Sequence, residues 1–282
     1  MKTKTKRLLI SGVTTAAIFS SFAIPQVRVE ANEFLSLFRV NQLEMVKLTQ
    51  SDISEIDNWV RENKEGSLDL AGIGKLEMSE IAGEPKFFDT YQSAVEAGYS
   101  VPELGEYEVE AVCVTPATTI TFTLNVEKAN QLLTQLGSEQ QFEAALDKQS
   151  FSVSTFDAIE TDYTQNEQHI RYMRTKSPEI LVPEGVSVDE LKATLLSLPF
   201  LPENVKTQLA DIDHIETTLP IPLVEREGST MTEVRVGNAP GFVVESKEDS
   251  YMVWQENSNI HVIYTQSKMG AEELMELIKK MK

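Results

Sequence analysis

Residues 217–265 decide the fold, and they read TTLPIPLVEREGSTMTEVRVGNAPGFVVESKEDSYMVWQENSNIHVIYT. Five short runs rich in Val, Ile, Thr and aromatic residues lie at 217–224, 232–237, 241–246, 250–256 and 259–265. Turn-forming residues separate most of them, at 228–229, 238–240 and 257–259. Short strands joined by short turns are typical of an antiparallel meander. This stretch therefore predicts five consecutive antiparallel strands.

The chain ends in GAEELMELIKKMK, which predicts a helix at 270–282. Leu274, Leu277, Ile278 and Met281 recur at helical spacing and form one apolar stripe. Glutamates stand at the start of the helix and lysines at its end, which complements the helix dipole. We expect the stripe to pack on the sheet.

The meander also holds the residues that we name as candidate ligand or partner contacts: Trp254, Tyr251 and Tyr264. Strand alternation places Tyr251 and Val253 on one face and Met252 and Trp254 on the other. A large aromatic side chain serves either as core or as a contact residue. Trp254 fits a core role as well as a contact role.

Upstream of the meander, helices and strands alternate. Helical spacing, N-caps and stop signals predict helices at 50–63, 90–98, 126–137, 188–198 and 202–212, the last two forming a hairpin. Thr49 with Asp52, and Ser187 with Glu190, have the spacing of capping boxes. Strands are predicted at 71–78, 109–124 (with Pro116 at an edge or bulge), 151–159 and 169–183. The fold class is α+β, an antiparallel sheet with helices packed on one face.

The N-terminus begins with four basic residues, Lys2, Lys4, Lys6 and Arg7, followed by an apolar run at 8–27. Twenty residues in a helix are long enough to cross a bilayer, so the run predicts an apolar helix that stays as a membrane anchor. The alternative is a signal peptide cut after Ala31, since Val29 and Ala31 are small at the positions that a signal peptidase reads. Both options place residues 32–282 outside the cytoplasm, as one domain or as two subdomains with a boundary near residue 185. We expect a cell-membrane protein with an extracytoplasmic C-terminal domain, or a secreted one.

Charge excludes one class of partner. The chain has 25 basic and 44 acidic residues. Five of the basic residues and one acidic residue lie in 1–31, so residues 32–282 carry a net charge of −23. Phosphate backbones would repel this charge, which excludes nucleic acid. Cations, basic proteins and neutral surfaces remain as partners.

No motif in the sequence points to catalysis, a cofactor or a metal ion. The AGIGK segment lacks the spacing of a phosphate-binding loop, and G-x-S-x-G and H-E-x-x-H are absent. His169, His214 and His261 have no ligand-like neighbours at short spacing, although acidic residues flank His214. The lone cysteine, Cys113, lies in a β-like run and predicts a buried structural thiol. We therefore expect no enzyme, no cofactor and no catalytic or metal-binding residue.

A resemblance adds to this interpretation. The segments VWQENSNIHVIYTQS, AEELMELIKKM and AGYSVP, with LLSLPFLPENVKTQLADIDHIETTLPIP and NEFLSLFRV, resemble a bacterial extracytoplasmic domain of unknown function. That domain lies on single-pass membrane proteins of the anti-sigma-regulator type, and it is also similar in shape to the half-barrels of lipoprotein carriers. Only seven residues precede the apolar run here, so we expect no cytoplasmic anti-sigma module.

The resemblance implies a sensing or regulatory module that acts through a membrane partner such as a transporter or sensor. Two alternatives stay open: a carrier of a lipid or another apolar ligand, and an envelope hydrolase.

Overall fold

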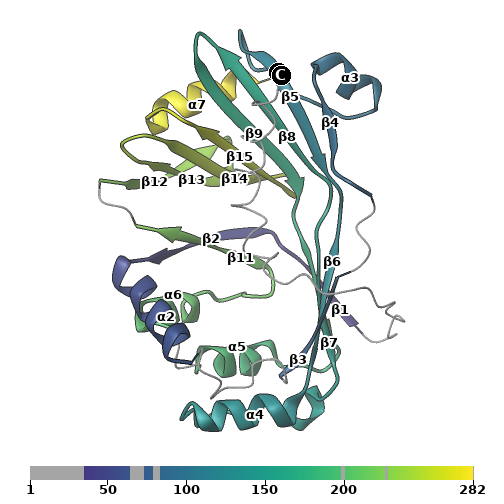
Figure 1. The fold of residues 1–282 in the computed structure, drawn as a ribbon, viewed down its shortest axis with the longest axis vertical. Coiled ribbons are helices and arrows are strands. Elements are labelled where there is room, and N and C mark those ends of the chain that lie inside the picture. The colour runs from purple at the N-terminus through teal and green to yellow at the C-terminus, as the bar shows by residue number, and fades with distance from the viewer. Residues whose placement is uncertain (1–34, 64–72, 79–82, 198–200, 226–227, 282) are drawn as a thin grey trace.

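The computed structural model describes residues 35–63, 73–78, 83–197, 201–225 and 228–281. The predicted apolar helix at 8–27 and the cleavage site at Ala31 lie outside these residues. The described part is an α+β structure of three sheets and six helices, with antiparallel pairing in the two larger sheets (Figure 1). The α+β class is thereby confirmed. Within the described residues, no helix is long and apolar enough to cross a membrane.

The largest sheet has eight antiparallel strands and contains the quoted meander. Its order is β12 (Thr230–Val236), β13 (Ala239–Glu245), β14 (Ser250–Glu256), β15 (Asn259–Thr265), β9 (Gln168–Lys176), β8 (Ala158–Gln165), β5 (Glu108–Thr115) and β4 (Lys86–Phe88). The last four predicted strands of the meander are confirmed as β12 to β15. Because β15 pairs with β9, this sheet joins strands from both sides of residue 185.

The first predicted strand of the meander does not belong to it. β11 (Thr218–Val224) pairs in parallel with β2 (Gln42–Leu48) in a separate two-stranded sheet, the ribbon. Thr217 and Glu225 form backbone hydrogen bonds with the two ends of β2. The backbone N–H and C=O groups of the odd-numbered residues of β11 therefore point toward β2. Pro220 and Pro222 therefore face the other side, where they have no N–H group to offer. Another strand cannot form a full ladder on that side, so β11 accepts only one strand partner, and that partner is β2.

The third sheet has five strands, in the order β1 (Leu35–Arg39), β10 (Glu179–Pro183), β7 (Ser150–Ser154), β6 (Thr119–Leu124) and β3 (Gly74–Met78). The predictions of single strands at 109–124, 151–159 and 169–183 are wrong. Each run divides into two strands, one in each of the two larger sheets, because the chain crosses between these sheets at residues 116–118, 155–157 and 177–178. The first two crossings are tied together by Ala117 N–H donating to Asp157 Oδ1 at 2.9 Å.

Helices and the ribbon cover opposite faces of the eight-stranded sheet. Leu274 of α7 (Ala271–Lys279) packs on Met252, and Ala94 of α3 (Tyr91–Glu96) packs on Val112. Met252 and Val112 belong to one cross-strand row, so α3 and α7 share a face, as predicted. Leu43 and Leu223 of the ribbon pack on the other face.

The remaining helices lie around the five-stranded sheet and the ribbon. They are α2 (Gln50–Asn63), α4 (Val126–Gln135), α5 (Val188–Leu196) and α6 (Glu203–Ala210), with a 3₁₀ turn at Ala144–Leu146. The capping box before α2 is confirmed, because Thr49 N donates to Asp52 Oδ2 and Asp52 N donates to Thr49 Oγ1. Ser187 caps α5 through Glu190 N–H. The hairpin is closed by Lys192, whose Nζ donates to the carbonyls of Ala210 and Ile212.

Candidate functional site

The structure separates the three predicted contact residues. Trp254 lies in the core beneath α7 with only 3% of its surface exposed. Tyr251 and Tyr264 are half-buried and lie on the opposite face, where they are direct cross-strand partners. The predicted alternation along β14 is thus confirmed. Trp254 is a core residue, and the contact role remains a prediction for the two tyrosines.

Trp254 and its neighbours form an aromatic cluster within the core. Its ring stacks on His261, with centroids 4.8 Å apart and planes 10° from parallel. The hydroxyl of Tyr172 lies 2.7 Å from His261 Nδ1. Burial, followed by the charge of Arg174, lowers the pKa of His261 to about 4, and burial raises the pKa of Tyr172 to about 12. Both groups are therefore neutral at pH 7, and the imidazole tautomer determines which of them donates the hydrogen bond.

Charged side chains of the neighbouring strands lie in a row beside Tyr264, on the same face of the sheet. Its cross-strand neighbour is Arg171, whose guanidinium donates to both carboxylate oxygens of Asp162, at 2.7 and 3.2 Å. Glu160 lies 3.4 Å from the same guanidinium, and its burial raises its pKa. On this face of the sheet, tyrosine rings lie beside an arginine whose guanidinium is already paired with two carboxylates.

Cys113 stands next to Glu160 across the strands of the same face. Its thiol is half-buried, and burial, with the charge of Glu160, raises its pKa. The thiol is thus protonated at neutral pH and is a poor nucleophile. The sequence predicts a buried thiol, and the structure shows one that is only partly buried.

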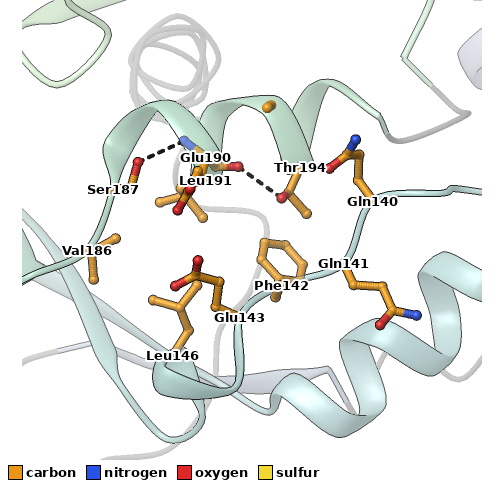
Figure 2. Close-up of a pocket in the computed structure, with 11 residues that line it drawn as sticks. Gln140, Gln141, Phe142, Glu143, Leu146, Val186, Ser187, Glu190, Leu191 and Thr194 are labelled. Atoms are coloured by element: carbon orange, nitrogen blue, oxygen red, sulfur yellow. Dashed lines mark hydrogen bonds between the residues drawn. The ribbon is translucent and has the colours of Figure 1, made fainter.

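A pocket of about 220 Å³ lies at the other end of the molecule, between residues 140–146 and the start of α5 (Figure 2). We call it the acidic pocket. Phe142, Leu146 and Leu191 give it apolar walls, and Glu143 and Glu190 supply the carboxylates. Figure 2 shows Glu143 rising from its loop toward α5.

The carboxyl groups of Glu143 and Glu190 approach each other in the acidic pocket (Figure 2). A hydrogen bond with Glu190, together with the charge of Glu190, raises the pKa of Glu143. The pKa rises because a carboxyl group beside a second carboxylate ionises less readily. A cation between the two groups would relieve this repulsion. The arrangement therefore suits a basic group with an apolar stem, such as an arginine or lysine side chain.

The sequence did not reveal this pair. Glu190 was predicted only as the partner of Ser187 in a capping box, and Glu143 attracted no interpretation. The two residues are 47 positions apart and belong to different elements, so no local pattern connects them. Only the packing of α5 against the loop after α4 brings them together.

The histidines form no metal site in the part of the chain that the structure describes, where no group of three His, Cys, Asp or Glu side chains is arranged to hold an ion. His169 lies 3.6 Å from Glu110, and His214 lies 3.5 Å from Glu216. Each is thus a single pair on the surface.

Comparison with known proteins adds no relative: no family model, no curated protein and no solved structure matches this chain.

Proposed function

We propose that this protein is a non-enzymatic binding module that works outside the cytoplasm and regulates a membrane partner. The observation that carries the proposal is the acidic pocket, in which the carboxyl groups of Glu143 and Glu190 approach each other beside apolar walls. A partner that inserts a basic side chain would replace the repulsion between these groups with a charge-assisted contact. The long apolar run at 8–27 is the reason for placing this event at a membrane.

The charge of the whole chain favours the same kind of partner. The net charge of −19 attracts a basic surface at long range, and the acidic pocket offers a specific contact at short range. Because Glu143 must give up its proton, the contact strengthens as the pH rises through the pKa of that group. Weak binding in acid and stronger binding near neutral pH is the expected pattern.

An envelope hydrolase is less well supported by this geometry. A glycosidase needs carboxyl groups about 5 to 9.5 Å apart, so that substrate or water fits between them. Glu143 and Glu190 instead hydrogen-bond directly, and both side chains are exposed. Such a pair has neither the spacing nor the enclosure that acid–base catalysis requires.

A lipid carrier would need an apolar space on the concave side of the sheet. In this chain α7 occupies the face that carries Met252 and Trp254, and Leu274 is fully buried there. An acyl chain could enter only if α7 moved away. The carrier function therefore remains the weaker alternative.

Co-purification from native membranes in mild detergent tests the proposal. We expect a membrane partner to be retained by the wild-type chain and by Glu184→Gln, a nearby exposed residue outside the acidic pocket. The double variant Glu143→Gln/Glu190→Gln should lose most of that partner. Equal recovery by all three chains would overturn the role of the pocket.

A further inference from the structure

No described strand pairs with the outer edge of the eight-stranded sheet at β12. This strand has seven residues, without proline or lysine, and stands last in the sheet order. Proteins usually shorten, interrupt or cover such an edge, because its free N–H and C=O groups accept another strand. In the part of the chain that the structure describes, β12 shows none of these protections.

The other described edges of this sheet and of the ribbon are blunted. At the far end of the sheet, β4 has only three residues. In the ribbon, two prolines interrupt the outer side of β11. The outer side of β2 is covered by Gln208, whose amide accepts from Lys47 N–H at 2.8 Å and donates to Lys47 C=O at 2.9 Å. The difference between β12 and these protected edges indicates that β12 is available to pair with another strand.

The backbone of β12 determines which residues face outward. A two-residue turn joins Val236 to Ala239, and Gly237 has φ +60° at its first central position, which fits a type II′ hairpin. Residues that flank such a turn are hydrogen-bonded to each other, so Val236, Val234 and every second residue before them face β13. Met231, Glu233 and Arg235 therefore direct their N–H and C=O groups to the open edge.

We propose that a second copy of this chain occupies the edge, with β12 pairing antiparallel to β12 about a two-fold axis at Val234. In this register Glu233 lies opposite Arg235 of the second copy, and the reverse pair forms on the other side of the axis. Both side chains are exposed and lie on one face of the strand. A shift by two residues in one direction would oppose two glutamates, and in the other direction two arginines, so charge selects the register.

The surface beside β12 agrees with this pairing. A groove of about 420 Å³ lies between β12 and α7, with Val234, Ala271 and Met275 among its lining residues. A two-fold axis across an antiparallel edge is perpendicular to the sheet, so both copies of α7 lie on the same side. The two grooves would then adjoin, and each would be covered by apolar side chains of the other copy. The dimer is independent of the acidic pocket, because α5, whose start lines that pocket, lies apart from β12 (Figure 1).

Charge reversal tests the register in the full-length chain, by sedimentation in detergent. We expect wild type to be a dimer, and Glu233→Arg or Arg235→Glu to weaken association at least tenfold, because each places like charges opposite each other. The double variant Glu233→Arg/Arg235→Glu should restore it. A dimer that survives both single reversals would overturn the proposal, since it would arise elsewhere, such as in the N-terminal segment.

A disulfide test gives a second readout that does not depend on affinity. In a Cys113→Ser background, Val234→Cys places two thiols directly opposite at a non-hydrogen-bonded pair, where Cα atoms lie about 4.5 Å apart and a disulfide can form. Thr232→Cys is the matched control, because its opposite residue is Val236 of the second copy. We expect oxidation to cross-link the first variant and not the second. A monomer that does not cross-link, or equal cross-linking of both variants, would overturn the proposal and leave the edge to a strand of a different protein.

Discussion

Trp254 and His261 are cross-strand partners whose rings stack in parallel, 4.8 Å apart, beneath α7. This pair joins the quoted meander to the helix that follows it. Tyr172 extends the cluster into β9, because its hydroxyl forms a hydrogen bond with His261. The cluster thus connects the C-terminal strands to those formed by the middle of the chain.

Removal of the indole should destabilise the whole eight-stranded sheet. Replacing a buried tryptophan with alanine costs about 3–5 kcal/mol, since it removes apolar contacts and leaves a cavity. We expect Trp254→Ala to lower the free energy of unfolding by that amount in urea titrations. Phe87→Ala, which truncates a ring that is 65% exposed, should change it by less than about 1 kcal/mol. Similar losses in both variants would contradict the core role of Trp254.

His261 should make stability depend on pH. Its pKa is about 4 in the folded chain and near 6.5 when unfolded, so the unfolded state binds more protons between these values. Stability should therefore fall as the pH decreases from about 6.5 to 4, by roughly 2 kcal/mol once partial exposure is allowed for. Unfolding titrations at both ends of this window, on wild type and His261→Phe, isolate this contribution. An identical pH dependence in the two chains would show that His261 does not cause it.

Gly241 should not tolerate a side chain. It lies opposite Trp254, and an added Cβ would approach Trp254 Cβ and Val253 O to 2.8 Å. Gly241→Ala should therefore destabilise the protein by about 1–3 kcal/mol. Neither of the two atoms is at the far end of a flexible side chain, so neither can move aside easily. Pro240→Ala, at the exposed neighbouring position, serves as the control in thermal unfolding. A neutral effect of Gly241→Ala would mean that β13 and β14 can separate at little cost.

Asp52 should make the stability of α2 decrease in acid. Burial opposes its ionisation, but hydrogen bonds from the Thr49 backbone, Asn204 and the Thr49 hydroxyl outweigh this and lower its pKa. Its contribution is present above pH 3.8 and is lost as the pH falls through the lowered pKa. Asp52→Ala should cost about 2–3 kcal/mol at pH 7, because it leaves buried donors unpaired.

Glu55→Ala, on the exposed side of the same helix, is the matched control for Asp52. Both variants can be compared by urea titration at pH 7 and at pH 3. Equal unfolding energies for the two variants at pH 7 would contradict the capping role.

Local signals predicted the elements well and the sheet partners only in part. The β12 to β15 meander, the α7 stripe and the Thr49 cap depend on residues close in sequence, and all were predicted. The parallel pairing of β11 with β2 joins residues 176 positions apart, from Thr218 to Gln42. The prolines limit β11 to one strand partner, but nothing in the sequence of β11 indicates which strand that partner is.

The candidate site was harder to predict than the helices and strands, because it too depends on residues that are far apart in the sequence. Alternation correctly divided Trp254 from Tyr251, but it did not tell which face a helix would cover. The acidic pocket depends on Glu143 and Glu190 meeting across two elements. Abundant carboxylates in the sequence give no reason to choose this pair over any other.

The most direct test of the central claim, that the acidic pocket binds a basic side chain, is an NMR titration with N-acetyl-arginine amide at pH 7. We predict chemical-shift changes confined to Phe142, Glu143, Glu190 and Leu191, with a dissociation constant on the order of millimolar for so small a probe. They should vanish in Glu143→Gln/Glu190→Gln and persist in Glu184→Gln. Shifts spread over the acidic surface, or unchanged in the double variant, would contradict the claim.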